Sequence, residues 1–160
     1  MSKRTVVAAV VGFVGGLTVI VGTVLPWLSI SAAGDLSITG VGGEETVTGL
    51  STVMGILLVP LGVLIMVAAA WLWAGSDVRK SAGLLGSPGA AAFVLATSVL
   101  LTKSNALGLG FGLSDEGVGI EIGVYVMLVG GLLAVVAAIV AALPEGPAIE
   151  TSGAEPAPSV

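Results

Sequence analysis

The side chains best able to do chemistry are six acidic residues in two stretches between apolar segments. They are Asp35, Glu44, Glu45, Asp115, Glu116 and Glu121. Oxygen-rich loops can bind Ca²⁺ or Mg²⁺, and paired carboxylates can act as acid and base. However, Glu44-Glu45 and Asp115-Glu116 are adjacent pairs in turn-like sequence without an EF-hand pattern, which is typical of solvated loop charge. We therefore expect no metal site; cation binding and catalysis by these carboxylates are the alternatives.

The chain contains neither Cys nor His among its 160 residues. Their absence excludes disulfides, thiol nucleophiles, Cys/His zinc sites, His-ligated haem and histidine general bases. The net charge of −5 argues against a nucleic-acid partner, because such a partner requires a basic patch. We predict no catalytic residue, no cofactor and no bound metal, and a protein that is not an enzyme.

The composition indicates that lipid surrounds much of the chain. Hydrophobic residues make up 56% and charged residues 9%, with a mean hydropathy of +1.14. Soluble domains carry about 25% charged residues, so this chain has too few charges to solvate a globular surface.

Four apolar runs without a charged residue cover about residues 5–25, 50–74, 82–101 and 123–143. Each has roughly 20 residues or more, which is enough to cross about 30 Å of hydrocarbon as a helix. The sequence predicts an all-α membrane protein with a four-transmembrane-helix bundle, formed by residues 1–143. Residues 144–160 are rich in Pro, Ala, Ser and Glu, which predicts a disordered cytoplasmic tail.

A cleavable signal peptide is the alternative reading of the first run. Residues 1–4 resemble a basic leader and residues 31–33 a cleavage site. The apolar run is longer than the usual 7–15 residues of a signal peptide, which favours a retained span.

Basic residues predict the orientation in the membrane. Lys3 and Arg4 precede the first span, Arg79 and Lys80 lie between the second and third, and only Lys103 falls on the opposite side. Because cytoplasmic loops carry an excess of Lys and Arg, we expect a multi-pass protein of the cell (plasma) membrane with both termini in the cytoplasm. The aromatic residues near span ends are expected to anchor in the interfaces: Trp27, Trp71, Trp73 and Tyr125.

The two outer segments, about residues 28–48 and 105–122, predict β-hairpins. In the first, apolar and polar residues alternate over 28–32 and 36–39 around a turn at 33–35, and this period of two is typical of strands. Because an isolated hairpin is marginally stable, we expect both to join into one small extracytoplasmic sheet.

In the second outer segment, residues 107–113 and 118–122 alternate in the same way around a turn at 114–117. The interior glycines of residues 107–113 disfavour a strand there.

The order of basic pair, span, hairpin and span occurs twice, over about residues 3–74 and 79–143, and indicates an internal repeat. Gly49, Gly55 and Gly62 match Gly123, Gly130 and Ala137. Both halves begin on the same side, so the repeat would be parallel and two-fold. The alternative is the chance likeness of two segments rich in Gly, Ala and Val.

Small residues recur at helix-packing intervals, and in lipid they permit close contact between helices. The predicted helix-packing residues are Gly12, Gly16, Gly55, Gly62, Gly123 and Gly130. We expect packing within one bundle; a seam with a partner or a second copy is the alternative.

Pro60 and Pro88 lie inside spans, where each removes a backbone hydrogen bond and should kink its helix. We expect the kinks to shape packing, and a hinge or cavity is the alternative. Proton relays and most ion-coupled carriers keep an ionisable group at membrane depth, and none lies in these spans. The hydroxyls there can bond to backbone carbonyls one turn back.

The stretch Leu25-Pro26-Trp27, an outer hairpin and then residues 46–50 resemble small four-span membrane proteins of unassigned function from actinobacteria and haloarchaea. The resemblance covers the first half of the chain and implies no activity. The layout of four helices with an outer sheet is also similar to that of claudins, but their Trp-Gly-Leu-Trp and paired-cysteine pattern is missing.

Together these features predict an accessory or scaffold protein that packs laterally against a membrane protein partner or itself and presents a sheet outside. An oligomeric small channel or carrier for an uncharged solute is the alternative. A membrane enzyme that uses the outer carboxylates comes third.

Overall fold

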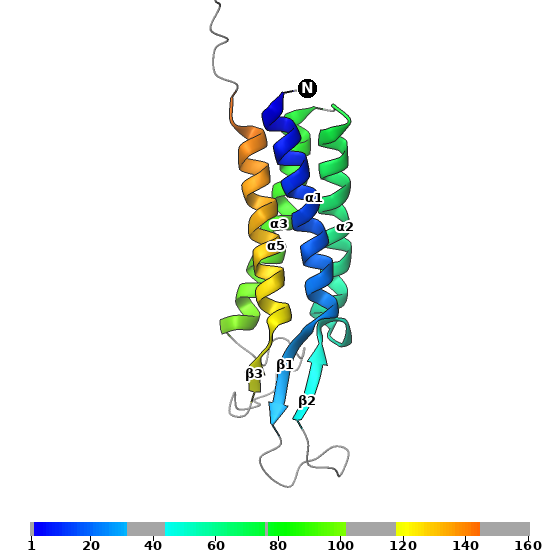
Figure 1. The fold of residues 1–160 in the computed structure, drawn as a ribbon, viewed down its shortest axis with the longest axis vertical. Helices are drawn as coiled ribbons and strands as arrows, with labels where there is room; N and C mark the ends of the chain where they lie inside the picture. Colours follow the sequence, from blue (N-terminus) through cyan, green and yellow to red (C-terminus); the bar gives the residue numbers. More distant parts are fainter. Residues whose placement is uncertain (1, 32–43, 76, 102–117, 145–160) are drawn as a thin grey trace, which may run out of the picture.

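A computed structural model describes residues 2–31, 44–75, 77–101 and 118–144 of the chain. Four long helices lie side by side and alternate in direction (Figure 1). They are α1 (Lys3–Val24), α2 (Val53–Trp73), α3 (Val78–Leu101) and α5 (Ile122–Ala142). Each is long and apolar enough to cross a membrane, and at 1.5 Å per residue even 21 residues span about 32 Å. The prediction of four long apolar helices is confirmed.

Side-chain caps set two of the helix starts. The Ser2 hydroxyl accepts a hydrogen bond from the Thr5 backbone N–H at 3.3 Å, which begins α1. Thr52 accepts one from the Gly55 N–H at 3.0 Å and begins α2. Such caps satisfy backbone donors that have no partner inside the helix.

α3 begins at Val78, four residues before the predicted start of the third span. Asp77 accounts for the earlier start, because its carboxylate accepts from the Arg79 N–H at 3.1 Å and its carbonyl from the Ser81 N–H at 3.0 Å. The apolar run marks the part of the helix suited to lipid, whereas the helix itself continues into the charged turn.

The helices form a closed ring in which α1 and α3 each pack against both α2 and α5. The core contains Leu58 and Ile65 from α2, Leu85 from α3 and Met127 from α5, all fully buried. Large apolar side chains also cover the outside, among them Phe13, Leu57, Val94 and Ile139. A helix bundle that is apolar all round is suited to lipid.

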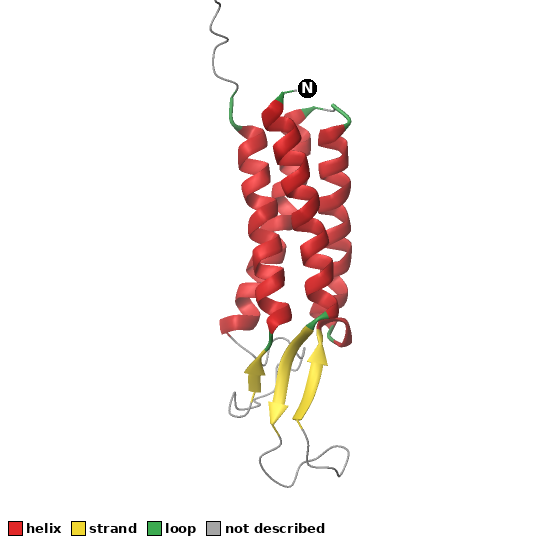
Figure 2. Ribbon diagram, in the orientation of Figure 1, coloured by secondary structure: helices red, strands yellow, loops and turns green. Residues whose placement is uncertain are grey.

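Three short strands form an antiparallel sheet at one end of the bundle (Figure 2). β1 (Pro26–Ser31) lies between β2 (Glu44–Thr48) and β3 (Val118–Ile120). The strands therefore come from both outer segments, and the prediction that the two segments join into one sheet is confirmed.

β1 pairs through Ser29 with Thr46 on one edge and with Gly119 on the other. The predicted turns at residues 33–35 and 114–117 and the predicted strands at 36–39 and 107–113 lie outside the described part of the chain and stay predictions, as does the tail at 145–160.

The two ends of the bundle differ in character. The start of α1, the α2–α3 turn and the end of α5 lie together at the end opposite the sheet (Figure 1). Lys3, Arg4, Arg79 and Lys80 are at this end, which we call the basic end. We call the other the sheet end.

Candidate functional site

The structure does not assemble the acidic residues into a site within its described residues. No group of three or more Asp, Glu, His or Cys able to hold a metal occurs there. Glu44 and Glu45 lie on β2, and Glu121 is half-buried just before α5, where its backbone N–H donates to the Trp27 carbonyl at 2.8 Å. Asp35, Asp115 and Glu116 lie outside the described residues.

Trp27 joins the sheet to the helices. The residue is fully buried, and its indole N–H donates to the Gly22 carbonyl at 2.8 Å. Glycines lie on two sides of the ring: a Cβ atom built at Gly49 would collide with the indole, and one at Gly123 would lie 2.7 Å from its Cδ1 atom. The ring therefore fits between the end of α1, the turn before α2 and the start of α5.

This position differs from the interfacial one that the sequence suggested for Trp27. A tryptophan at the end of a span can lie in the headgroup region or close the end of the bundle, and both positions offer its N–H a partner. Here the indole has its partner inside the protein and is enclosed by it.

An irregularity in β1 allows this placement. The register of β1 against β2 shifts between Pro26 and Leu28, and both Trp27 and Leu28 are fully buried. Neighbouring residues of a regular strand point to opposite faces. A bulge redirects a side chain, so two consecutive large residues can both reach the core.

The most extensive helix contact runs between α1 and α5 and is lined by glycines in reciprocal pairs. A Cβ atom at Gly130 would lie 2.8 Å from the Gly15 carbonyl oxygen, and one at Gly15 2.9 Å from that of Gly130. Gly22 and Gly123 face each other in the same way, at 3.1 and 2.9 Å. At these distances no side chain fits without moving a helix.

Gly15 and Gly22 were missed by the sequence reasoning. Their seven-residue spacing matches that of Gly123 and Gly130, and this equal spacing on two helices was the available signal.

The other predicted packing glycines are also buried inside the chain. Gly16 and Gly62 form a reciprocal pair between α1 and α2, and Gly12 lies against Leu85 of α3. Gly55 packs against Gly49 in the turn before its own helix. These glycines therefore contribute to contacts within the bundle and do not face outward.

Both predicted kink residues lie inside helices, as expected. Pro60 is exposed on α2, whereas Pro88 is buried on α3. Beside Pro88, Gly89 approaches Ala134 of α5, where a Cβ atom would lie 2.7 Å from the alanine Cβ.

The hydroxyl groups within the long helices bond to the backbone of their own helices. Thr18 donates to the Val14 carbonyl at 2.8 Å and Thr97 to that of Phe93 at 2.8 Å. Thr23 and Ser98 make similar bonds three residues back. Within the described residues no buried side-chain nitrogen or oxygen lacks a partner. The prediction that hydroxyl groups in the helices donate to backbone carbonyls about one turn back is confirmed for these four residues.

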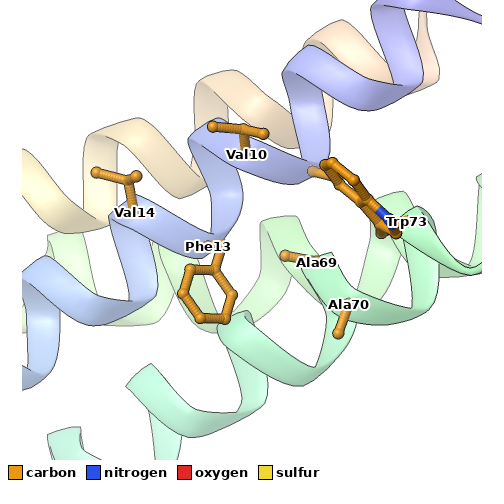
Figure 3. Close-up of a pocket in the computed structure, with 7 residues that line it drawn as sticks. Val10, Phe13, Val14, Ala69, Ala70 and Trp73 are labelled. Carbon is orange, nitrogen blue, oxygen red and sulfur yellow. The ribbon is translucent and has the colours of Figure 1, made fainter.

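Two grooves open on the outer surface of the bundle beside α2. The first lies between α1 and α2 and has a volume of about 290 Å³. Figure 3 shows Phe13 from α1 and Trp73 from α2 on either side of Ala69 and Ala70. Every side chain in its lining is apolar or aromatic.

The second groove lies between α2 and α3, has a volume of about 380 Å³ and extends towards the basic end. From α2 it is lined by Leu61, Leu64, Val67, Ala68 and Trp71, and from α3 by Gly83, Leu84, Ser87, Pro88 and Ala91. Trp71 and Trp73 are thus half-exposed near the basic end, one in each groove, and Tyr125 is half-exposed near the sheet end.

No protein-family model matches the chain, and no curated protein is significantly similar to it.

Proposed function

We propose that the chain is a multi-pass protein of the cell membrane, with both termini in the cytoplasm, and that it acts as a non-enzymatic accessory or scaffold protein. Four apolar helices with apolar outer surfaces support insertion. All Lys and Arg in the described residues lie at the basic end, which the positive-inside rule assigns to the cytoplasm.

Retention of α1 is part of this proposal. Gly15 and Gly22 hold α1 against α5, and Gly16 holds it against α2. Cleavage after this helix would expose the facing glycines and remove the helix that carries the Trp27 acceptor. The packing of α1 therefore supports a membrane span and not a signal peptide.

The observation that carries the scaffold proposal is the attachment of the sheet to three parts of the bundle. The indole of Trp27 contacts the end of α1, Gly49 before α2 and Gly123 of α5. A sheet fixed in this way holds a constant orientation relative to the membrane, which suits a surface that a partner recognises.

The lateral partner, a second membrane protein or another copy, would meet the outer helix faces. The predicted glycine seams do not support this part of the proposal, because they are buried within the chain. An oligomeric channel or carrier gains no support from the interior, which in the described residues consists mainly of apolar side chains packed around glycines.

The parallel two-fold repeat remains part of the proposal. Its matched glycines, Gly49 and Gly123, both approach the ring of Trp27. Gly49 lies in the short turn before α2, and Gly123 lies in the first turn of α5. The two halves therefore place a small residue at an equivalent structural position.

Site-specific cross-linking in intact cells tests the scaffold function. A photoreactive residue at Thr46, exposed on β2, is expected to give one discrete adduct. The matched control is Ala74, which is exposed at the basic end and should not give that adduct. Absence of an adduct from Thr46, and from exposed positions on each helix, would contradict a scaffold role.

A further inference from the structure

We propose that the groove between α2 and α3 binds one acyl chain of an anionic phospholipid of the surrounding bilayer, with the headgroup beside Lys80 and Arg79. This inference rests on the membrane placement proposed above and adds a ligand that the scaffold role does not require. Three features carry it: the shape of the groove, its lining and the charge at its end.

The groove is long and apolar. Its lining on α2 extends from Leu61 to Trp71, which at 1.5 Å per residue corresponds to about 15 Å. A single extended hydrocarbon chain suits this shape.

The lining explains why the groove exists. Gly83, Ser87 and Ala91 recur at four-residue intervals on α3 and so share one helix face. They form a low floor, and a Cβ atom built at Gly83 would meet no atom within 4 Å. Leu64 and Trp71 of α2 and Leu84 of α3 provide large apolar walls.

Lys80 lies on the same face of α3, one turn before Leu84 and on the side of the basic end. Its side chain is 82% exposed, and its ammonium lies 3.7 Å from the Asp77 carboxylate, which is itself 56% exposed. An exposed pair of this kind is weak, and Arg79 adds a further positive charge. Basic pockets between spans on the cytoplasmic side bind anionic headgroups, so the charge complements such a lipid.

The test uses the fluorescence of Trp71 in the purified full-length protein. A Trp73→Phe background leaves Trp71 and the fully buried Trp27. Phosphatidylglycerol with brominated acyl chains is titrated into the protein in detergent, because bromine quenches tryptophan at short range. The proposal predicts saturable quenching and a weaker response to brominated phosphatidylcholine.

Two variants and a matched control sharpen the measurement. Gly83→Leu fills the groove, and we expect it to weaken the apparent affinity about tenfold or more, in line with the effect of small changes in apolar pockets. Ala90→Leu introduces the same side chain on α3 at an exposed position outside the lining and should leave the affinity for the lipid unchanged. Lys80→Gln should lower the affinity for phosphatidylglycerol about fivefold and leave the response to phosphatidylcholine unchanged.

Quenching that rises without saturation, and that is equal in the Gly83→Leu and Ala90→Leu variants, would contradict lipid binding in the groove. Such quenching would come only from the surrounding lipid. The lipid proposal would also be contradicted if the protein formed a concentration-dependent dimer that the Gly83→Leu substitution dissociates, because the groove would then bind a second copy. Membrane insertion is checked separately by alkaline carbonate extraction. Extraction of the protein would contradict the proposed membrane placement, whereas an inserted protein without saturable quenching contradicts the lipid alone.

Discussion

The indole nitrogen of Trp27 lies 2.8 Å from the carbonyl oxygen of Gly22, to which it donates a buried hydrogen bond. Gly22 is in the last turns of α1, and Trp27 is the second residue of β1. The bond closes the point where the chain leaves the helix for the sheet. The apolar helices and the outer sheet thereby become one structural unit.

Replacing Trp27 with Phe should destabilise the protein. The change removes the donor for the Gly22 carbonyl and leaves a cavity between Gly49 and Gly123. An unsatisfied buried acceptor and lost packing together predict a loss of about 2 kcal/mol or more. Thermal unfolding of the purified variant in detergent measures the effect.

The control for this change is Trp73→Phe, because Trp73 is half-exposed on α2. Substitutions at such positions usually change stability by no more than about 0.5 kcal/mol. Equal melting temperatures for the two variants would contradict the role assigned to Trp27.

Replacing Gly130 with Ala should force α1 and α5 apart. The new methyl group would meet backbone atoms of Gly15 and Val19, both at 2.8 Å, and backbone cannot move aside as a flexible side chain can. Overpacking of this kind costs about 1–3 kcal/mol, which thermal unfolding in detergent would detect.

Gly83→Ala is the matched substitution, since its methyl group would enter open space. Because alanine is favoured over glycine inside helices by roughly 0.5–1 kcal/mol, this variant should be as stable as the parent or more so. If Gly130→Ala were equally well tolerated, α1 and α5 would not be in the close contact described.

Removing the basic pair at the start of α1 should weaken the orientation of the protein. In the Lys3→Gln, Arg4→Gln double variant, only Arg79 and Lys80 distinguish the proposed cytoplasmic side, and orientation follows the distribution of Lys and Arg. We expect a mixed population, measured by protease protection of an N-terminal epitope tag. Substituting Glu44 and Glu45 with Gln should leave orientation unchanged, since acidic residues contribute little; a larger effect from the glutamates would contradict the assignment.

Removing divalent cations should not change stability. The described residues contain no cluster of acidic side chains that could hold a metal, so chelation is expected to shift the melting temperature by no more than experimental error. A reproducible fall in melting temperature that Ca²⁺ or Mg²⁺ reverses would contradict this expectation and would favour a cation site in the acidic loops.

Helix number and position could be predicted from the sequence because lipid imposes a simple requirement: long apolar runs that close their own hydrogen bonds. The joining of both outer segments into one sheet was predictable for a related reason, since their apolar faces needed cover. The first helix residue of α3 was not, because the Asp77 cap lies outside the apolar run.

The strand partners and the place of Trp27 depend on contacts between distant segments. Alternation over residues 28–32 indicates a strand but does not identify its neighbours, and β1 pairs with residues near 46 and 119. An aromatic residue at the end of a span fits either the lipid interface or a cap. Trp27 is buried at the end of the bundle because Gly49 and Gly123, which are distant from it in sequence, leave space for its ring.

Because the chain contains no cysteine, the orientation of the bundle can be measured directly. Single cysteines are introduced at Thr46, exposed on β2, and at Asp77, exposed in the α2–α3 turn. Cells are then treated with a membrane-impermeant maleimide. We predict labelling at position 46 in intact cells and at position 77 only after permeabilisation. Labelling of both positions in intact cells, or of position 77 alone, would contradict this account.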